Sequence, residues 1–411
     1  MRICLIGAAN PSNNPRLLRE ADLLSQRHDV RVVCAGSGRA FAEADSRLLA
    51  RRTWKLQRID SARADWAASE LGGVAWLRSI FTRGRRRLAQ DAFSYVKTDG
   101  LAASSCCATL PQLRRLASAE PADLFIAHTQ PVLPAAAAAA TQWNAKLGFD
   151  CEDLLSETGD NFCEAIRLIE RKYFRVCDYI SATSRQMADY LVTKSRVDNP
   201  LVLYNVFPLS LAEGLRAPIS RPSHARLRLH WFSQTIGLDR GLQDVFAACS
   251  GLSEEVEIHL RGRVSAEHRN ALLGEAARHG VASCVNFHPR VDHDDLIRSM
   301  AEYDVGLALE RVQNRNYSLT VTNKVFAYML AGLAIAATHT PGQCEVISQA
   351  PDAGALYPAQ MATSLREILE SWIKDRAKLR RAQQAAWDAA RSRFCWDIEQ
   401  KKFLEVLDRV L

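Results

Sequence analysis

The sequence predicts an α/β protein of two domains, each built around a parallel β-sheet. Short apolar runs such as RICLIG and DVRVVCAG alternate with helical patterns, which is typical of parallel sheets covered by helices. The alternation stops at residues 208–226, which hold three prolines and show no clear period, and then starts again. At 411 residues the chain is long enough for two ordinary domains. We therefore expect domains at residues 1–207 and 227–385, joined by a linker at 208–226.

Composition narrows the classes of partner and compartment. Lys and Arg number 53 against 46 Asp and Glu, and this mild excess fits anionic substrates or a membrane surface better than nucleic acid. Eleven cysteines without C-x-x-C or zinc spacing predict a reduced compartment. Neither a secretory signal nor an apolar run of about 20 residues is visible. We expect a cytoplasmic protein that is soluble or peripheral at the inner face of the cell membrane.

The first domain opens with a β-α-β unit, in which a strand at 2–6 leads through the loop GAANPSNNPR to a helix at 17–27 and a strand at 29–36. A dinucleotide fingerprint needs three glycines at this turn, and the loop has only Gly7, which argues against an NAD site. Asn10 and Asn14 could instead bind polar groups of a substrate. A solvated turn with a helix cap explains them equally well.

Residues 61–116 have a helical pattern, and the segment 76–97 mixes aromatic and basic residues. Such a helix can lie in an anionic membrane interface, and this segment is our candidate for peripheral membrane contact. A core-facing apolar stripe with a solvated basic face is an equally good interpretation.

The alternation then continues to the end of the first domain. Its expected elements are strands at 123–130, 147–154, 178–184 and 200–207, with helices at 131–146, 165–176 and 185–194. Several of these strands end in polar residues: His128, Thr129 and Gln130 in one, Asp150, Glu152 and Asp153 in the next, and Thr183 and Ser184 in a third. A lone histidine is more often structural than catalytic. Three carboxylates so close together repel each other unless a substrate or cation uses them, so we expect the acceptor side of a reaction at this edge.

The second domain begins with a strand at 226–234 and the loop TIGLDRG, followed by a helix from residue 242. Gly237 allows close approach of the backbone to a ligand, and Arg240 can hold a phosphate by two hydrogen bonds. This loop is a plausible diphosphate cradle. Further strands are expected at 255–262, 283–290 and 304–310, with helices at 265–280 and 292–303. Asp292 and Asp294 form a D-x-D, but they open a helix, where Asp is the expected cap, and no metal site is assigned.

The stretch 323–345 is the clearest supersecondary unit in the chain. Apolar residues recur at spacings of three and four up to Gly332, where a helix would stop, and a short strand LAIAA and the turn THTPG follow. Lys324 lies in the first turn of this helix, where a cation is unfavourable to the helix dipole. We expect Lys324 and the helix N-terminus to share an anion.

Several segments together resemble the family-4 glycosyltransferases of GT-B architecture. These are the loop TIGLDRGL, the unit from DVGLALE to NKVFAYMLAGLAIAATHTPG, and the closing FCWDIEQKKFLEVL. The resemblance extends over most of the chain and is strongest from residue 229. It implies two Rossmann-like domains facing across a cleft, with a final helix within residues 386–411 crossing back to the first domain.

The same resemblance implies the reaction. The second domain would bind a nucleotide-diphosphate sugar such as a UDP- or GDP-sugar, and the first would bind a glycan, lipid-linked or small-molecule acceptor. Transfer in this family usually retains the anomeric configuration without a metal, so neither a cofactor nor a metal is expected. An epimerase of the same architecture and a non-catalytic nucleotide-binding subunit are the alternatives, while a nicotinamide dehydrogenase is disfavoured by the missing glycines.

The resemblance also assigns site residues, with two departures. Arg240 matches one cation of the family's donor-phosphate pair, and Lys324 would replace the other, because Ser233 and Gln234 stand where Gly-Arg is usual. Two family glutamates near the ribose and the sugar read Ala327 and Leu319. Donor contacts are therefore expected from Gly237, Arg240, Glu310, Thr322, Asn323 and Lys324. The catalytic set is Arg240 and Lys324 on the leaving diphosphate with Asp153 or Glu152 as proton acceptor, and the acceptor-side residues are Asn10, Asn14, His128 and Asp150.

Overall fold

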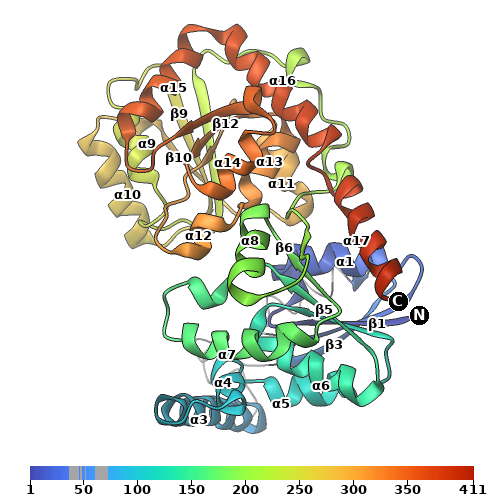
Figure 1. The fold of residues 1–411 in the computed structure, drawn as a ribbon. Helices are drawn as coiled ribbons and strands as arrows, with labels where there is room; N and C mark the ends of the chain where they lie inside the picture. Colours follow the sequence, from blue (N-terminus) through green and yellow to red (C-terminus); the bar gives the residue numbers. More distant parts are fainter. Residues whose placement is uncertain (37–45, 47–48, 51, 61–72) are drawn as a thin grey trace. The chain divides into compact units, whose positions relative to one another are not determined.

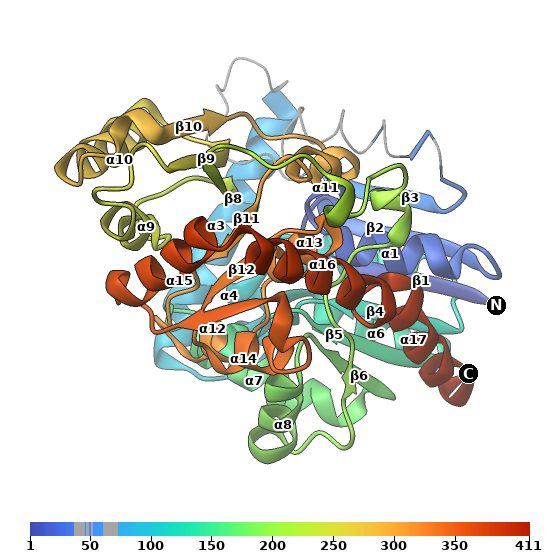
Figure 2. The same cartoon turned by 90° about the horizontal axis from the view of Figure 1, so that it is seen from above.

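The structure is a computed structural model that describes residues 1–36, 46, 49–50, 52–60 and 73–411 (Figure 1). The chain divides into two compact units. Unit 1 comprises Met1–Thr183, Met187–Leu203 and Lys402–Leu411, and unit 2 comprises Ser184–Gln186 and Tyr204–Lys401. The two chain termini both belong to unit 1 and lie near each other in both views (Figures 1 and 2).

Unit 1 is built on a parallel sheet with strand order β3-β2-β1-β4-β5-β6-β7. Its strands are β1 (Arg2–Gly7), β2 (Asp29–Gly36), β3 (Lys55–Asp60), β4 (Leu124–His128), β5 (Lys146–Cys151), β6 (Tyr179–Ala182) and β7 (Leu201–Val202). Its helices are α1 (Pro15–Leu24), α3 (Gly73–Tyr95), α4 (Asp99–Cys106), α5 (Leu110–Ser118), α6 (Leu133–Trp143) and α7 (Cys163–Tyr173). Helix α8 (Arg185–Tyr190) continues into a π-helical turn, Leu191–Ser195.

Unit 2 repeats this plan with the parallel order β10-β9-β8-β11-β12-β13. Its strands are β8 (Leu227–Thr235), β9 (Val256–Arg263), β10 (Val285–His288), β11 (Val305–Ala308), β12 (Ala334–Thr338) and β13 (Gly354–Tyr357). The helices are α9 (Leu242–Ala248), α10 (Ala266–Arg278), α11 (His293–Met300), α12 (Arg315–Leu319), α13 (Asn323–Ala331), α14 (Pro341–Ile347), α15 (Ala362–Lys374) and α16 (Arg376–Ser392). Helix α17 (Trp396–Val410) begins in unit 2 and ends in unit 1.

Short 3-10 helices complete both units. They cover Pro11–Asn13, Gln130–Val132, Leu155–Glu157, Phe174–Val176, Leu209–Ala212, Pro218–Ser220, Ala282–Cys284 and Pro351–Ala353. Among the described residues, no helix has both the length and the apolar character needed to cross a membrane.

Each sheet has one point where the strand order reverses. In unit 1 it lies between β1 and β4, and in unit 2 between β8 and β11. The connections after the two strands at such a point leave toward opposite faces of the sheet, which opens a crevice outside their carboxyl ends where α/β proteins bind ligands. The predicted residues at the strand ends therefore have a defined place in the fold.

The predicted fold class is confirmed, and so is the helix-strand unit beginning at residue 323. Helix α13 starts after Thr322 and ends at Gly332, whose φ of +74° is the left-handed conformation that stops a helix. A Cβ on Gly332 would lie 2.7 Å from a ring carbon of Pro218, so the contact also needs glycine. The strand that follows is fully buried, as a central parallel strand requires.

Three strands differ from expectation. The sequence analysis did not identify β3 or β13, and of the strand expected at 200–207 only Leu201–Val202 pairs with the sheet. All three are edge strands: β3 and β7 form the two edges of the first sheet, and β13 forms one edge of the second. An edge strand pairs on one side only, so it can be short or polar, and its apolar signal is correspondingly weak.

Candidate active site

Asn14 joins the first loop of unit 1 to the end of β5. It is the N-cap of α1, where its Oδ1 accepts hydrogen bonds from the backbone N–H groups of Arg16 and Leu17 at 3.1 and 3.0 Å. Its Nδ2 donates to Oε1 of Glu152 at 2.6 Å. The cap explanation and the site explanation for Asn14 are therefore compatible, because one side chain does both.

His128, the last residue of β4, is fully buried among three carboxylates. Its Nδ1 lies 3.1 Å from Glu152 Oε1 and 3.3 Å from Asp150 Oδ2, and its Nε2 lies 3.2 Å from Glu20 Oε2. Burial alone would lower the pKa of His128, but the charge of Glu20 and the hydrogen bonds of all three carboxylates outweigh it. The pKa of His128 is therefore raised well above its usual value, which favours the imidazolium form.

Asp150 is held as a carboxylate by donors on both oxygens. Arg16 Nε donates to Oδ2 at 2.5 Å, and Ser181 Oγ donates to Oδ1 at 2.6 Å. Burial would raise the pKa of Asp150, but Arg16, together with His128, lowers it below the ordinary range. The Arg16 guanidinium also donates to the main-chain oxygen of Leu203 at 2.5 Å, which fixes its position.

Arg16 and Glu20 were not predicted as site residues. They occupy positions i and i+4 of α1, so they share one face of the helix, and both are buried. A pair of opposite charges in the first turns of a helix that starts at a sheet edge is a signal that could have suggested them. Surface salt bridges have the same spacing, however, so the sequence alone does not distinguish the two cases.

The remaining predicted residues of unit 1 lie around this group. Asn10 is buried, and its main-chain oxygen accepts from the N–H of Asn13 at the start of a 3-10 turn. Asp153 contributes its main-chain oxygen, which accepts from Gln130 Nε2 at 2.8 Å. The structure therefore joins Asn14, His128, Asp150 and Glu152 by direct contacts, with Asn10 and Asp153 in the adjoining loops.

Thr129, directly after His128, has an unusual backbone conformation. Its φ is +75°, which is rare for a β-branched side chain and costs on the order of 1–3 kcal/mol. Such conformations cluster at functional sites, since the surrounding structure has to impose them. Thr129 lies between His128, which contacts the buried carboxylates, and Gln130, which donates to the main-chain oxygen of Asp153 and to Glu170.

The buried acids and His128 could in principle hold a metal ion. One ligand atom from each of Glu20, His128 and Asp150 lies within 4.8 Å of the others. Arg16, however, lies 2.5 Å from Asp150 and 3.7 Å from Glu20, and its positive charge would repel a divalent cation at this place. The donor set therefore fits a network of ion pairs better than a metal centre.

In unit 2 the loops after β8 and β11 touch each other at the switch point. Gly241 has a φ of +78°, and a Cβ there would lie 2.8 Å from the main-chain oxygen of Leu309. Gly237 is buried in the same loop. Arg240 is partly exposed, with its Nε 3.6 Å from Asp239 Oδ1. The loop is thus anchored by a glycine contact and presents an arginine next to it.

Lys324 lies between an acid and an aromatic ring. Its Nζ is 2.7 Å from Glu310 Oε1 and 5.9 Å from the ring centroid of Trp231. Both members of the ion pair are largely buried, and Glu310 offsets the unfavourable position of a cation at the start of α13. Trp231, a buried residue of strand β8, was not predicted as part of the site.

Thr322 and Asn323 complete the start of α13. Thr322 is its N-cap residue, yet its hydroxyl does not cap the helix. The Oγ1 atom is buried and has no hydrogen-bond partner among the residues that the structure describes. A buried polar atom without a partner costs free energy, which a ligand could recover.

Residues 14–205 match the family model of the glycosyl transferase 4-like domain. The matched segment makes up slightly less than half of the chain and is similar to this domain. The predicted resemblance to family 4 is confirmed, and the prediction of a glycosyltransferase is confirmed at the level of this family.

Solved structures show the same fold over the whole chain. HepE from Anabaena, in complex with UDP-glucose, has 17% identity and a TM-score of 0.70 with 100% of both chains covered. Sucrose-phosphate synthase from Thermosynechococcus elongatus has 13% identity and a TM-score of 0.68, with 100% of this chain and 99% of that chain covered. WaaG, a glycosyltransferase involved in lipopolysaccharide biosynthesis, has 14% identity and a TM-score of 0.59 with 97% of both chains covered. No curated protein matches the sequence.

The match to the glycosyl transferase 4-like domain begins at Asn14 and ends in the segment after β7. It therefore contains the network of Arg16, Glu20, His128, Asp150 and Glu152. The charged residues of unit 1 that the sequence analysis singled out at the strand ends, and the two it missed, all belong to this matched segment.

The positions of unit 2 at which the resemblance implies other residues have defined places in the fold. Ala327, where the resemblance implies a ribose-binding Glu, is fully buried in α13. Ser233 and Gln234 stand near the end of β8, in place of Gly-Arg. Among the acids considered for the donor side, Glu310 is the one that contacts Lys324.

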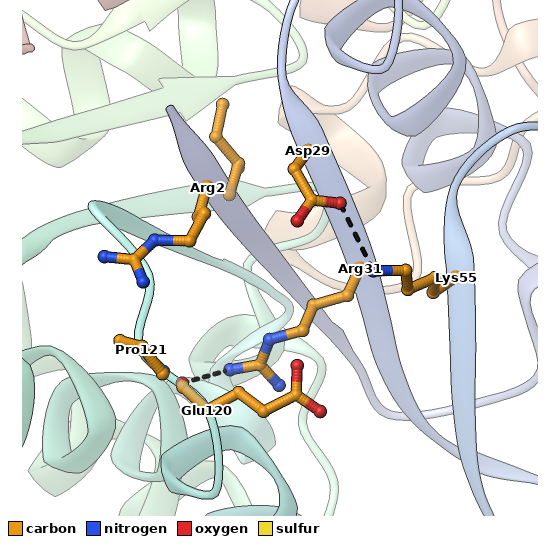
Figure 3. Close-up of a pocket in the computed structure, with 7 residues that line it drawn as sticks. Arg2, Asp29, Arg31, Lys55, Glu120 and Pro121 are labelled. Atoms are coloured by element: carbon orange, nitrogen blue, oxygen red, sulfur yellow. Dashed lines mark hydrogen bonds and ion pairs between the residues drawn. The ribbon is translucent and has the colours of Figure 1, made fainter.

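A pocket of about 150 Å³ lies at the opposite edge of the first sheet, at the amino ends of β1, β2 and β3 (Figure 3). Its charges already have partners. Asp29 pairs with Lys55 at 3.6 Å, and Arg31 donates to the main-chain oxygen of Glu120 at 2.8 Å. Arg31 also donates to the main-chain oxygen of Ala117 at the end of α5. We interpret this pocket as a helix-end anchor and not as part of the active site.

Proposed function

We propose that the protein transfers a sugar from a nucleotide diphosphate to the hydroxyl of an acceptor, with retention of the anomeric configuration and without a metal ion. The observation that carries this proposal is the arrangement at the switch point of unit 2. There the loop with Arg240 touches the loop after β11, and Lys324 stands at the start of α13. A helix N-terminus with two nearby cations is suited to a diphosphate.

The donor would bind through polar groups that lack a hydrogen-bond partner and through a cation that can exchange its present partner for the diphosphate. The unpartnered Oγ1 of Thr322 and the first N–H groups of α13, from Asn323 on, can donate to phosphate oxygens. Lys324 can exchange Glu310 for the diphosphate. Glu310 would then be free to accept hydrogen bonds from the ribose hydroxyls, the role that Ala327 cannot perform.

The solved structures support the donor class. HepE forms complexes with UDP and with UDP-glucose, so a UDP-sugar is the first donor to test, with a GDP-sugar second. The name of WaaG supports a glycan or lipid-linked acceptor.

The chemistry follows from the charges. As the bond between C1 of the sugar and the phosphate oxygen breaks, Arg240 and Lys324 stabilise the negative charge on the leaving diphosphate; one such donor is worth about 3 kcal/mol in enzymes. The acceptor hydroxyl attacks C1 from the face of the departing phosphate. Its proton passes to a phosphate oxygen or to the carboxylate of Glu152 or Asp153. Asn10, Asn14, His128 and Asp150 form the acceptor side.

We also propose peripheral contact with an anionic membrane through α3. Phe81, Leu88 and Tyr95 follow each other at intervals of seven residues, and their exposed fractions are 71%, 70% and 88%. A spacing of seven places them along one side of the helix. Arg83 and Arg87, exposed on the same helix, could bind lipid phosphates. The side chains of residues 76–79 lie outside the described residues.

The donor assignment is tested by the variants Arg240→Ala and Lys324→Ala. Each is expected to lower release of the nucleotide diphosphate about 100-fold, because each removes a cation from the leaving group. Lys374→Ala, which removes an exposed surface cation of the same unit, is the matched control and should stay near wild type. Near-normal turnover in both site variants would overturn the assignment.

The same assay separates the alternatives. Conversion of the nucleotide sugar to an epimer without an acceptor would identify an epimerase. Binding of a nucleotide diphosphate with neither hydrolysis nor transfer would identify a non-catalytic subunit.

A further inference from the structure

Glu152 differs from the other acids of the unit 1 network in one respect. Its side chain is 19% exposed, whereas those of Glu20 and Asp150 are 1% exposed. Glu152 is therefore the point at which the buried network reaches solvent.

The two oxygens of Glu152 have different surroundings. Asn14 Nδ2 at 2.6 Å and His128 Nδ1 at 3.1 Å both contact Oε1. Within the described part of the chain, no donor contacts Oε2. Two donors on one oxygen fix the plane of the carboxylate, so the direction of the second oxygen is fixed as well.

The direction of His128 depends in turn on α1. Its ring nitrogens contact carboxylates on both sides, Glu20 at Nε2 and Asp150 with Glu152 at Nδ1. The contact with Glu20 is an ion pair at 3.2 Å, and the imidazolium, which has a proton on both nitrogens, presents positive charge to carboxylates on both sides. Without Glu20, a neutral ring could keep its single proton on either nitrogen.

Arg16 holds Asp150 in place beside His128. The Nε of Arg16 donates a hydrogen bond to Oδ2 of Asp150 at 2.5 Å and lies 3.7 Å from Oε1 of Glu20. The groups facing His128 then comprise the carboxylates Glu20, Asp150 and Glu152 and the cation Arg16, with Arg19 buried on the same helix. Counting His128, three cationic groups face three acids. Burial raises the pKa of Glu20, and the positive charges of His128 and Arg16 oppose that rise.

We infer that Arg16 and Glu20 are positioning residues: through His128 they hold the Glu152 carboxylate so that its Oε2 receives a hydroxyl group of the acceptor. This inference rests on the proposed function and names the acceptor contact within it. The ligand chemistry is a neutral polyol, a sugar or a sugar-bearing molecule, since a carboxylate oxygen accepts hydrogen bonds from hydroxyl groups and repels anions.

The test is the ratio of transfer to hydrolysis in wild type, Glu20→Gln, Glu152→Gln and the double variant. Each enzyme receives the nucleotide sugar that wild type turns over, with glucose as the acceptor probe, and both the glycoside and the free donor sugar are measured. A ratio does not depend on how much of a variant is folded. Glu20→Gln and Glu152→Gln should each lower it about tenfold, the value of a hydrogen bond to a charged group.

The double variant distinguishes positioning from independent effects. If Glu20 acts through Glu152, Glu20→Gln has no further effect on the ratio in the Glu152→Gln background. Glu399→Gln is the control for losing a buried carboxylate elsewhere, because Glu399 is 1% exposed and accepts the N–H of Tyr204. It should lower stability and leave the ratio unchanged.

Two results would overturn the inference. One is a loss of stability in Glu20→Gln with an unchanged ratio, and the other is additive effects in the double variant. If wild type turns over no nucleotide sugar, the proposed function fails. Nitrogen NMR of labelled histidines then tests independently whether Glu20 controls the protonation of His128. His128 should carry two N–H protons at pH 8 in wild type and lose one in Glu20→Gln, while a neutral His128 in wild type would contradict the network.

Discussion

Glu170, on α7, is buried next to the site and accepts a hydrogen bond from Gln130 Nε2 at 3.1 Å. Burial raises its pKa from 4.5 to about 7, although hydrogen bonds from Ser156 and Gln130 partly oppose this. Because the folded-state pKa lies above the unfolded value, the folded protein binds this proton more tightly. The resulting stability is fully present below pH 4.5 and is lost as the pH rises through about 7.

We therefore predict that Glu170→Gln flattens the dependence of stability on pH. Wild type should lose roughly 3 kcal/mol of unfolding free energy between pH 4.5 and pH 8 from this group, and the variant should not. Denaturant unfolding across this range measures the difference. Glu164→Gln, which changes an exposed acid of the same helix, is the control. Parallel curves for wild type and Glu170→Gln would show that Glu170 is not buried as an acid.

At the residue scale, the sequence predicts what kind of partner a side chain needs better than it predicts which residue that partner is. Lys324 was expected to face an anion because of its place in the first helical turn, and the structure gives it Glu310, from a loop fourteen residues earlier. The partnership of Arg16 with Asp150 joins residues 134 positions apart. Such pairs depend on which strands become neighbours, so local patterns do not contain them.

At the scale of elements, the contact between the two loops of unit 2 is held by Gly241. We predict that Gly241→Ala destabilises the protein by about 1–3 kcal/mol and weakens nucleotide binding, because its Cβ would collide with the main chain at Leu309. Gly214→Ala is the matched control, since Gly214 has a φ of +80° with open space around it. Thermal unfolding with and without UDP measures both effects. Equal losses in the two variants would mean that the backbone conformation, and not the loop contact, is responsible.

Elements were predictable where the sequence pattern and the packing agree. Helix α13 and strand β12 have clear apolar periods and a glycine between them, and they form as expected. Strand β3, KLQRID, carries four charged or polar side chains among six residues and gains order from pairing with β2. Pairing of that kind is a tertiary effect, which local propensity does not report.

At the scale of the whole molecule, the fold class followed from the repeated alternation of strands and helices and from its interruption near residue 208. The donor and acceptor sides were assigned through a family resemblance. The matched segment and the solved structures confirm the fold that this resemblance implies. The chemistry of the acceptor side could not be derived in the same way, because it depends on the buried ion pairs.

Membrane contact is also a property of the whole molecule. The double variant Phe81→Ser, Leu88→Ser is predicted to bind vesicles of anionic phosphatidylglycerol at least tenfold more weakly, because burial of each large apolar side chain contributes about 1.5–3 kcal/mol. Ile219→Ser changes an equally exposed apolar residue outside α3 and should bind like wild type. Vesicle cosedimentation measures this. Unchanged binding in the double variant would exclude α3 as the contact.

The most direct test of the central claim is proton NMR of the product formed from a nucleotide sugar and an acceptor, starting with UDP-glucose and glucose and then other UDP- and GDP-sugars. We predict release of the nucleoside diphosphate together with a new glycoside whose anomeric proton shows the same configuration as the donor. A glycoside of inverted configuration would contradict the retaining mechanism. Absence of any glycoside with every donor, while the nucleotide still binds, would contradict the assignment as a glycosyltransferase.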